Sequence, residues 1–227
     1  MNFKIAPSLM CMNLMDLPSE LAFLNKRIDF YHVDIMDGHF VPNLTLSPYF
    51  VSQISPYTTA PIDCHLMVTN PENLIDPLIS AGADMISMQC EVIGNQAFRL
   101  INKIKEAGKQ VGIVINPATP LNQIEAYLSH LDKVTVMTVD PGFAGQTFIP
   151  ESLDKVRALV KLREKHSYKY LIEVDGSCNK TTYQRMYAAG AEVLVMGSSG
   201  LFGINGDLPS SWKKMVDDMA TAVMEAI

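Results

Sequence analysis

The sequence predicts one α/β domain over residues 1–227, a single (β/α)8 barrel of the TIM type. Three observations lead to this fold class. Short β-rich runs alternate with amphipathic helical patterns, a helix–glycine–acid–strand unit recurs, and no linker-like segment interrupts the alternation. An open doubly wound sheet is the alternative, but eight strands in 227 residues fit a closed barrel better, and nothing indicates a second domain.

The predicted strands are short and apolar. Several are nearly continuous hydrophobic runs, which is typical of a parallel sheet covered on both faces. In chain order they are Lys4–Ser8, Phe30–Met36, Pro61–Met67, Met85–Gln89, Gln110–Ile115, Lys133–Val139, Tyr170–Asp175 and Glu192–Gly197.

Apolar residues at helical spacing lie between these strands. Leu17, Leu21, Leu24 and Ile28 follow the first strand, and Asp16 is the expected N-cap of their helix. Two later stretches show similar spacing, namely Phe98, Ile101, Ile104 and Lys105, and then Leu153, Val156, Leu159 and Val160.

A local unit recurs along the chain. Ala81-Gly82-Ala83-Asp84 precedes the fourth predicted strand, and Ala189-Gly190-Ala191-Glu192 precedes the eighth. In each copy we expect the glycine to end a helix and the acidic residue to turn the chain into a strand. Lys105-Glu106-Ala107-Gly108 is a looser third copy. Such spaced copies are expected from the two halves of a barrel.

Composition limits the classes of function. The chain is 48% hydrophobic and 19% charged, which suffices for a large core. Its net charge of −6 and the lack of any Lys/Arg run argue against a nucleic-acid partner. The four cysteines are scattered, so we expect reduced thiols rather than a disulfide framework. No segment resembles a signal peptide or a membrane span, so the expected location is the cytoplasm.

Unusual polar residues fall at the predicted carboxyl ends of strands, where barrels of this type carry their active sites. Side chains alternate along a strand, so His32 and Asp34 share a face, while His65 and Asp175 end two other strands. A lone strand histidine is usually a core residue, but burying an unpaired carboxylate is costly. Two imidazoles and two carboxylates could instead bind one divalent ion per subunit, Zn, Mn, Co or Fe(II). His39, His130 and His166 are expected to be surface residues.

Glycine-bearing loops follow the last three predicted strands. Glycines let backbone N–H groups approach an anion, and this rim of the barrel is a recurrent phosphate site. Each loop alone would fit an ordinary turn, but three on one rim favour phosphate binding. The candidate residues are Gly142, Phe143, Ala144 and Gly145, then Gly176 and Ser177, and finally Gly197, Ser198 and Ser199.

Most of the 14 methionines are expected to fill the core. Met36, Met67 and Met137 differ, because strand parity directs each toward the mouth of the barrel. Apolar groups there would exclude water, make nearby carboxylates more basic and shield a reactive intermediate.

These residues strongly resemble those of the ribulose-phosphate 3-epimerase family. The resemblance covers almost the whole chain, and its second motif alone is highly specific. The motifs are SLMCMN from residue 8, HVDIMDGHFVPNLTLSP from 32, DCHLMV from 63, VMTVDPGFAGQTF from 136, EVDGS from 173 and VMGSSGLF from 195.

Within the family, the sequence is most similar to the D-allulose-6-phosphate 3-epimerase branch. The features that favour this branch over the pentose-phosphate branch are Leu46-Ser47-Pro48, Asp140, Ser177-Cys178-Asn179 and Ser199-Gly200-Leu201-Phe202. Homo-oligomerisation is suggested by the resemblance alone.

The resemblance implies roles for individual residues. The family's metal ligands fall on His32, Asp34, His65 and Asp175, with Asp34 as proton acceptor and Asp175 as donor in one direction. Substrate contacts fall on Ser8, His65 and Asp175 and on the glycine-bearing segments 142–145, 176–177 and 197–199. Relatives commonly have histidine where this chain has Gln89, so no role is assigned there.

The implied reaction inverts C3 of a ketose phosphate, preferably between D-allulose 6-phosphate and D-fructose 6-phosphate. Ribulose 5-phosphate and xylulose 5-phosphate are the nearest alternative pair. A metal-free decarboxylase on the same fold is less favoured, because such sites use lysine beside aspartate and no lysine sits at a strand end. A phosphosugar-binding barrel without catalysis is the third alternative.

Overall fold

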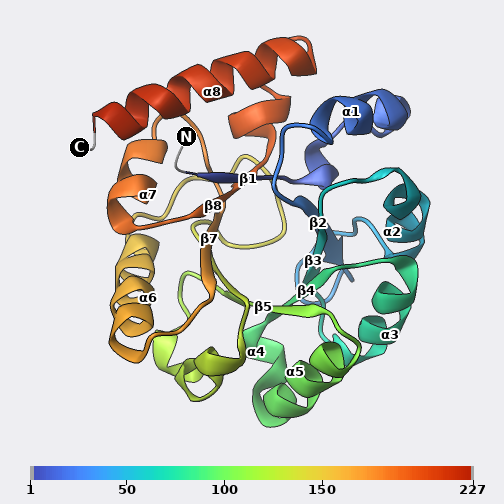
Figure 1. Cartoon of the computed structure of the whole chain (residues 1–227), viewed down its shortest axis with the longest axis vertical. Coiled ribbons are helices and arrows are strands. Elements are labelled where there is room, and N and C mark those ends of the chain that lie inside the picture. Colours follow the sequence, from blue (N-terminus) through green and yellow to red (C-terminus); the bar gives the residue numbers. More distant parts are fainter. Residues whose placement is uncertain (1–2, 226–227) are drawn as a thin grey trace.

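The computed structural model describes residues 3–225 and confirms the (β/α)8 barrel. Eight parallel strands form one sheet in the order β1-β8-β7-β6-β5-β4-β3-β2. A parallel bridge between Ser8 and His32 joins the first strand to the second and closes the ring. Figure 1 shows the helices arranged around this ring, with α8 crossing over the side on which β1, β8 and α7 lie.

The strands begin and end within two residues of the predicted positions. They are β1 (Lys4–Pro7), β2 (Tyr31–Met36), β3 (Ile62–Met67), β4 (Met85–Gln89), β5 (Gln110–Ile115), β6 (Lys133–Met137), β7 (Leu171–Asp175) and β8 (Val193–Met196). Five of them are buried at every position, as the continuous apolar runs predict, whereas β1 and β5 are open at their first residue and β7 is partly open at both ends.

Helices occupy the connections between strands. The α-helices are α1 (Leu17–Leu24), α2 (Pro48–Ile54), α3 (Glu72–Ala81), α4 (Cys90–Ile93), α5 (Ala97–Glu106), α6 (Ser152–His166), α7 (Tyr183–Ala189) and α8 (Leu208–Met224). Short 3-10 turns are η1 (Leu9–Cys11), η2 (Leu14–Asp16), η3 (Ser55–Tyr57), η4 (Gly94–Gln96), η5 (Leu121–Gln123) and η6 (Glu125–His130), and η7 (Ser198–Phe202) is a π-helical turn.

Two details of the helices differ from the sequence prediction. Helix α1 ends at Leu24, so Ile28 lies beyond it, and the side chain of the N-cap residue Asp16 makes no capping hydrogen bond. The described connection between β5 and β6 contains only η5 and η6. Pro120 is the N-cap residue of η5, the first of these two turns.

The recurring unit forms at the amino-terminal end of the barrel. Gly82 and Gly190 end α3 and α7 in the left-handed conformation that glycine tolerates best. The acidic residue that follows accepts a hydrogen bond from the backbone N–H of a neighbouring strand. Four such bonds occur, Asp29 with Ile5, Asp84 with Ile62, Asp132 with Val111 and Glu192 with Ile172, at 2.8–3.0 Å. The acidic residues therefore fasten adjacent strands together.

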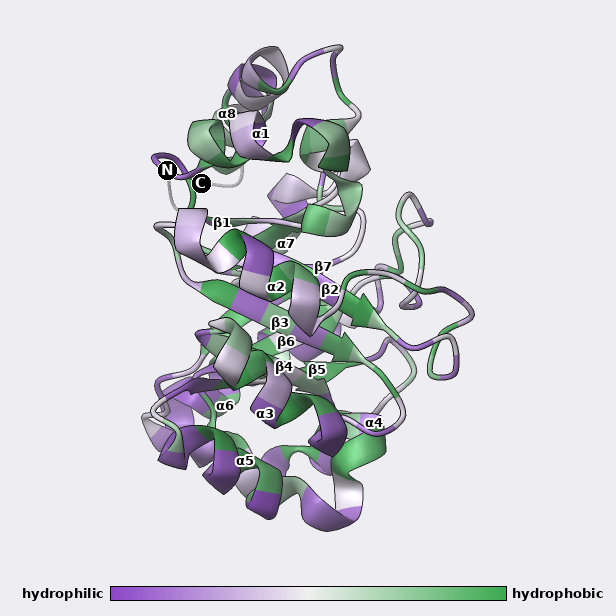
Figure 2. Cartoon of the chain, turned by 90° about the vertical axis from the view of Figure 1, so that its right-hand side faces the viewer, coloured by the Kyte–Doolittle hydropathy of each residue, from purple (hydrophilic) through white to green (hydrophobic). Residues whose placement is uncertain are grey.

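The main core lies between the barrel and its helices. Buried side chains of helices, such as Ile75, Ile101 and Leu159, join one cluster with outward-facing strand residues. Burying an apolar side chain of this size contributes about 1.5–3 kcal/mol, so this layer supplies most of the stability. Figure 2 shows the hydrophobic strands within the molecule and, to one side, the loops that follow the tips of the strand arrows.

Two further sequence predictions can be compared with the structure. All four cysteines are free thiols, as expected. Among residues 3–225, no helix is both long enough and apolar enough to cross a membrane.

Candidate active site

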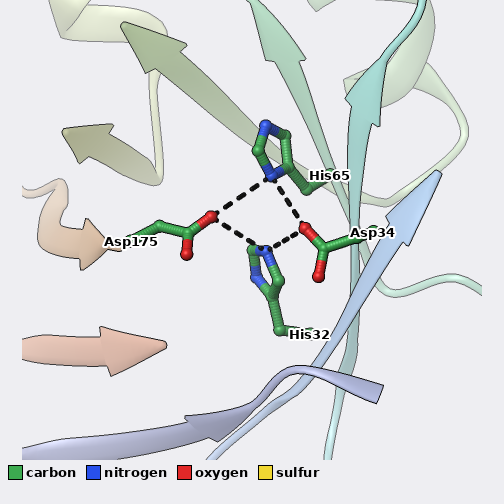
Figure 3. Close-up of side chains that lie close together, drawn as sticks. All are labelled: His32, Asp34, His65 and Asp175. Carbon is green, nitrogen blue, oxygen red and sulfur yellow. Dashed lines mark hydrogen bonds and ion pairs between the residues drawn. The ribbon is translucent and has the colours of Figure 1, made fainter. Parts of the chain in front are cut away.

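Four polar side chains meet at the carboxyl-terminal end of the barrel. His32 and Asp34 lie on β2, His65 on β3 and Asp175 at the end of β7. The strand register places Asp34 beside His65. One ligand atom from each of the four residues lies within 4.8 Å of the others. Figure 3 shows the two carboxylates on opposite sides of the paired imidazoles.

Both oxygens of the Asp34 carboxylate have close partners. Its Oδ1 lies 3.2 Å from His32 Nε2 and 3.2 Å from His65 Nδ1, while Oδ2 accepts a 2.6 Å hydrogen bond from Ser8. Asp175 is less tightly held, because its Oδ2 lies 3.7 Å from His32 Nε2 and 3.5 Å from His65 Nδ1. Asp175 is also more exposed to the pocket than Asp34, with 15% against 5% of its side chain accessible.

The electrostatics of the group favour bound positive charge. Burial alone would raise the pKa of Asp34, but the charge of His32 and hydrogen bonds from both imidazoles hold that pKa well below its usual range. Burial would lower the pKa of both imidazoles, yet the neighbouring carboxylates outweigh it and raise the pKa of His32 and His65. The carboxylates thus stabilise cationic charge here, whether protons or a metal ion carry it.

The donor set fits a divalent metal ion. Two imidazole nitrogens and two carboxylate oxygens converge from three strands, which is the ligand chemistry of Zn, Mn, Co or Fe(II). His32 and His65 are fully buried, and each has its second ring nitrogen bonded to another side chain. Such outer contacts are typical of metal-binding histidines. The cluster can therefore hold one metal ion.

A second, fully buried charged layer lies beneath these four residues. Asp63 Oδ2 is 3.2 Å from His32 Nδ1, and Asp63 Oδ1 accepts a 2.6 Å hydrogen bond from Ser87. Lys133, the first residue of β6, bonds to both Asp63 and Glu173. His32, Asp63 and Glu173 also form a potential ligand group, but the Lys133 ammonium already supplies its cation. This layer supports His32 from below.

A pocket opens above the four-residue group. Of the predicted substrate-binding residues, Ser8, Asp175 and every predicted residue of the three glycine-bearing loops line it. His65 does not, because it is completely buried beneath the pocket. Met36, Met67 and Met137 also line the pocket, and each is at most 5% exposed. The structure thus brings these predicted residues together around one pocket. His39, His130 and His166 are exposed, as expected.

The loop after β7 has a strained backbone held by several hydrogen bonds. Gly176 has φ +122° and Ser177 has φ +51°, the latter unusual for a residue other than glycine. The Ser177 carbonyl accepts hydrogen bonds from Asn179 (3.0 Å) and Thr182 (2.7 Å), and its hydroxyl donates to the Gln146 carbonyl. The last bond joins the loops after β6 and β7. Such fixed irregular backbone is typical of ligand-binding loops.

Sequence reasoning missed several residues of the site. Met10 and Cys11 line the pocket, and burial together with the charge of Asp34 raises the pKa of the Cys11 thiol to about 11, which disfavours the thiolate. Asp63, Lys133 and Glu173 also went unrecognised. No local signal marks these residues, because a lysine at the start of a strand is usually exposed, and only an inward-pointing side chain needs a buried partner.

Comparisons with known proteins support the family. A model of the ribulose-phosphate 3 epimerase family matches residues 4–202. The chain belongs to this family. Membership makes it an epimerase, and so confirms the isomerase class that the sequence predicts.

Named relatives of the family cover most of this chain. A ribulose-phosphate 3-epimerase of Bacillus subtilis is 41% identical over 198 residues, which are 86% of this chain and 91% of the relative. Another, from Aquifex aeolicus, is 37% identical over 96% of this chain and 98% of the relative. A chloroplastic ribulose-5-phosphate-3-epimerase of Arabidopsis thaliana is 39% identical over 88% of this chain and 71% of the relative.

More distant solved structures share the barrel alone. The 3-hexulose-6-phosphate synthase of Salmonella typhimurium superposes with a TM-score of 0.67 at 19% identity, covering 97% of this chain and all of that one. The tryptophan synthase A-subunit of Pyrococcus furiosus gives 0.69 at 14% identity over 97% and 98% of the two chains. At these identities the similarity extends to the fold only.

Proposed function

We propose that this family member is a metal-dependent ketose-phosphate 3-epimerase. One observation carries the proposal: two carboxylates, Asp34 and Asp175, approach a common point from opposite sides, beside two buried imidazoles and below a pocket. Inversion of a carbon centre needs this arrangement, because one group must remove a proton from one face and another must return a proton to the opposite face. The pocket gives the substrate access to both groups.

Two aspartates of the chain would carry out the proton transfer. Asp34 would remove the C3 proton of one epimer, and Asp175 would deliver a proton to the other face of the planar enediolate. In the reverse direction the two residues exchange roles. Ser8, which donates to Asp34 Oδ2, would hold that carboxylate in place. Met36, Met67 and Met137 would keep water away from the intermediate.

A divalent ion would be held by His32, Asp34, His65 and Asp175. When bound, it would supply positive charge that stabilises the oxygen atoms of the enediolate. We expect removal of the ion with a chelator to abolish proton exchange at C3, and addition of Zn, Mn, Co or Fe(II) to restore it. Circular dichroism before and after chelation serves as the control for folding. A fully active, metal-free sample would exclude this part of the proposal.

The phosphate of the substrate would lie against the loops after β7 and β8. Both loops line the pocket on the side away from β3 and β4, through Gly176, Ser177 and residues 197–199. No Lys or Arg lines the pocket within the described chain, so backbone N–H groups and serine hydroxyls would hold the anion.

The substitution Gly176→Ala tests this phosphate site. An added Cβ would lie 2.7 Å from the Val139 side chain and 2.9 Å from its backbone nitrogen, so the loop must move. We expect kcat/KM for a ketose phosphate to fall by about 10- to 100-fold, since a small misplacement of binding groups has effects of that size. Gly108→Ala is the control, because φ is also positive there but no atom lies within 4 Å. Equal kcat/KM values for both variants would contradict the assignment.

Two observations favour different sugars. The relatives are named ribulose-phosphate 3-epimerases, which favours ribulose 5-phosphate and xylulose 5-phosphate over the hexulose pair that the sequence features suggest. One specific observation still supports the second candidate pair, D-allulose 6-phosphate and D-fructose 6-phosphate. Asn179, one of the residues typical of that branch, donates to the Ser177 carbonyl and, at 3.3 Å, to the Ser199 hydroxyl. It therefore shapes the phosphate end of the pocket, where the length of the sugar matters.

The deciding experiment measures deuterium incorporation at C3 and kcat/KM for both ketose phosphates. C3 exchange together with epimerisation is the expected result, and the larger kcat/KM identifies the sugar. Metal-dependent binding without C3 exchange would instead support a phosphosugar-binding barrel. Release of carbon dioxide from a phosphorylated acid, without exchange at C3, would support a decarboxylase.

A further inference from the structure

His65 has two ring nitrogens with different surroundings. Its Nδ1 faces the carboxylates of Asp34 and Asp175, whereas its Nε2 lies 3.0 Å from the side-chain nitrogen of Gln89 at the end of β4. Both His65 and Gln89 are completely buried. The Gln89 amide oxygen is also buried and has no hydrogen-bond partner among the described residues. The imidazole of His65 is therefore the contact that decides which way this amide is turned.

The orientation of the amide must match the proton on the ring. As placed, the Gln89 N–H donates to His65 Nε2, which requires the ring proton to be on Nδ1, where it points at Asp34. To bind a metal ion, Nδ1 needs a free lone pair, so the proton must be on Nε2. The partner of Nε2 must then accept a hydrogen bond. A half-turn of the Gln89 amide brings its oxygen to the ring and meets this requirement.

His32 does not need such an adjustable partner. Its outer nitrogen, Nδ1, lies 3.2 Å from the carboxylate of Asp63, which is fixed by Lys133 and Ser87. A carboxylate only accepts, so Nδ1 keeps its proton, and a metal ion would replace only the proton that Nε2 directs at Asp34 and Asp175. The two imidazoles thus differ in the partner of their outer nitrogen. The partner of His32 already accepts a hydrogen bond, as metal binding requires, whereas the partner of His65 must turn its amide to do so.

We propose that Gln89 is a positioning residue for His65, and that its amide turns from donor to acceptor when a divalent ion binds. This inference rests on the proposed metal site and assigns a role to the position where the resemblance gave none. An amide suits the position because it donates and accepts without adding a charge to the barrel interior. An apolar residue of similar size would leave the Nε2 proton of metal-bound His65 buried without a partner, which is costly.

The test compares zinc affinities measured by competition with a chelating dye. Loss of an outer partner of a metal-binding histidine typically weakens binding by 10- to 100-fold, so we expect Gln89→Leu to weaken zinc binding by about that factor. Gln89→Glu, which keeps the accepting oxygen, should bind zinc at least as tightly as the wild-type protein. Met88→Leu is the matched control, because Met88 is equally buried on the same strand but packs into the outer hydrophobic core. Its affinity should not change.

The possible outcomes separate this inference from the proposed function. A wild-type protein that binds no zinc would contradict the metal site itself. Tight wild-type binding with unchanged affinity in Gln89→Leu would contradict only the role of Gln89. Equal losses in Gln89→Leu and Gln89→Glu would mean that the amide acts as a donor, which also overturns it.

A spectroscopic measurement needs no variant. In the zinc-loaded wild-type protein, nitrogen-15 spectra of the histidine rings should show His65 with its proton on Nε2 and His32 with its proton on Nδ1. A His65 proton on Nδ1 would overturn the inference even if Gln89→Leu failed to fold.

Discussion

Asp34→Asn is expected to lower kcat/KM for the ketose phosphate by about a thousandfold or more. General acid–base groups contribute factors of this size, and the same change removes a charged ligand from the metal site. The amide cannot take up a proton as the carboxylate does, and it offers only one oxygen where Asp34 now uses two, toward the imidazoles and toward Ser8. Steady-state kinetics with saturating metal provide the measurement.

Two comparisons make this prediction specific. Asp76→Asn changes an exposed aspartate on α3 that pairs with Lys103, and it should leave kcat/KM unchanged. Asp175→Asn should stop epimerisation but allow C3 exchange in the epimer from which Asp34 removes the proton. Near-normal turnover in either active-site variant would refute the two-base mechanism. Equal loss of exchange in both epimers at full metal occupancy would also argue against two separate bases.

The barrel could be predicted because its periodicity is local. Strands buried on both faces appear as short apolar runs, and each can be recognised without its neighbours. Parity along β2 likewise places His32 and Asp34 on one face, and the structure brings both to the mouth. Helix ends were less certain, as Ile28 shows, because apolar spacing continues past the point where α1 stops.

The buried charges could not be predicted, because they depend on register between strands far apart in the sequence. Lys133 meets Asp63 from 70 positions away and Glu173 from 40. Nothing local distinguishes Lys133 from a lysine at a solvent-exposed strand start. Gln89 presents the same difficulty, because its proposed role depends on its contact with the ring nitrogen of His65 on the adjacent strand. Residue types indicated a metal site, but the groups that orient its ligands emerge only in three dimensions.

Lys133→Met should destabilise the protein by about 3–5 kcal/mol, because it leaves two buried carboxylates without their cation. Lys133, Asp63 and Glu173 are each at most 1% exposed, and one oxygen of Glu173 already lacks a hydrogen-bond partner among the described residues. Methionine nearly matches the volume of lysine, so the loss comes from charge rather than from a cavity. Urea unfolding at pH 7 measures it. Lys103→Met removes the cation of an exposed pair and should cost less than about 1 kcal/mol.

The difference in unfolding free energy between Lys133→Met and the wild-type protein should depend on pH. In the wild-type protein, burial would raise the pKa of Asp63, but the charge of Lys133 outweighs burial and lowers that pKa. The stability that the ionised carboxylate adds is therefore present at neutral pH and is lost at low pH. In the variant, burial without the cation raises the pKa of the same carboxyl, so its destabilising effect is relieved as the pH falls. The two unfolding free energies should therefore converge between pH 7 and about pH 4. A constant difference over that range would mean that Lys133 stabilises the barrel through packing rather than charge.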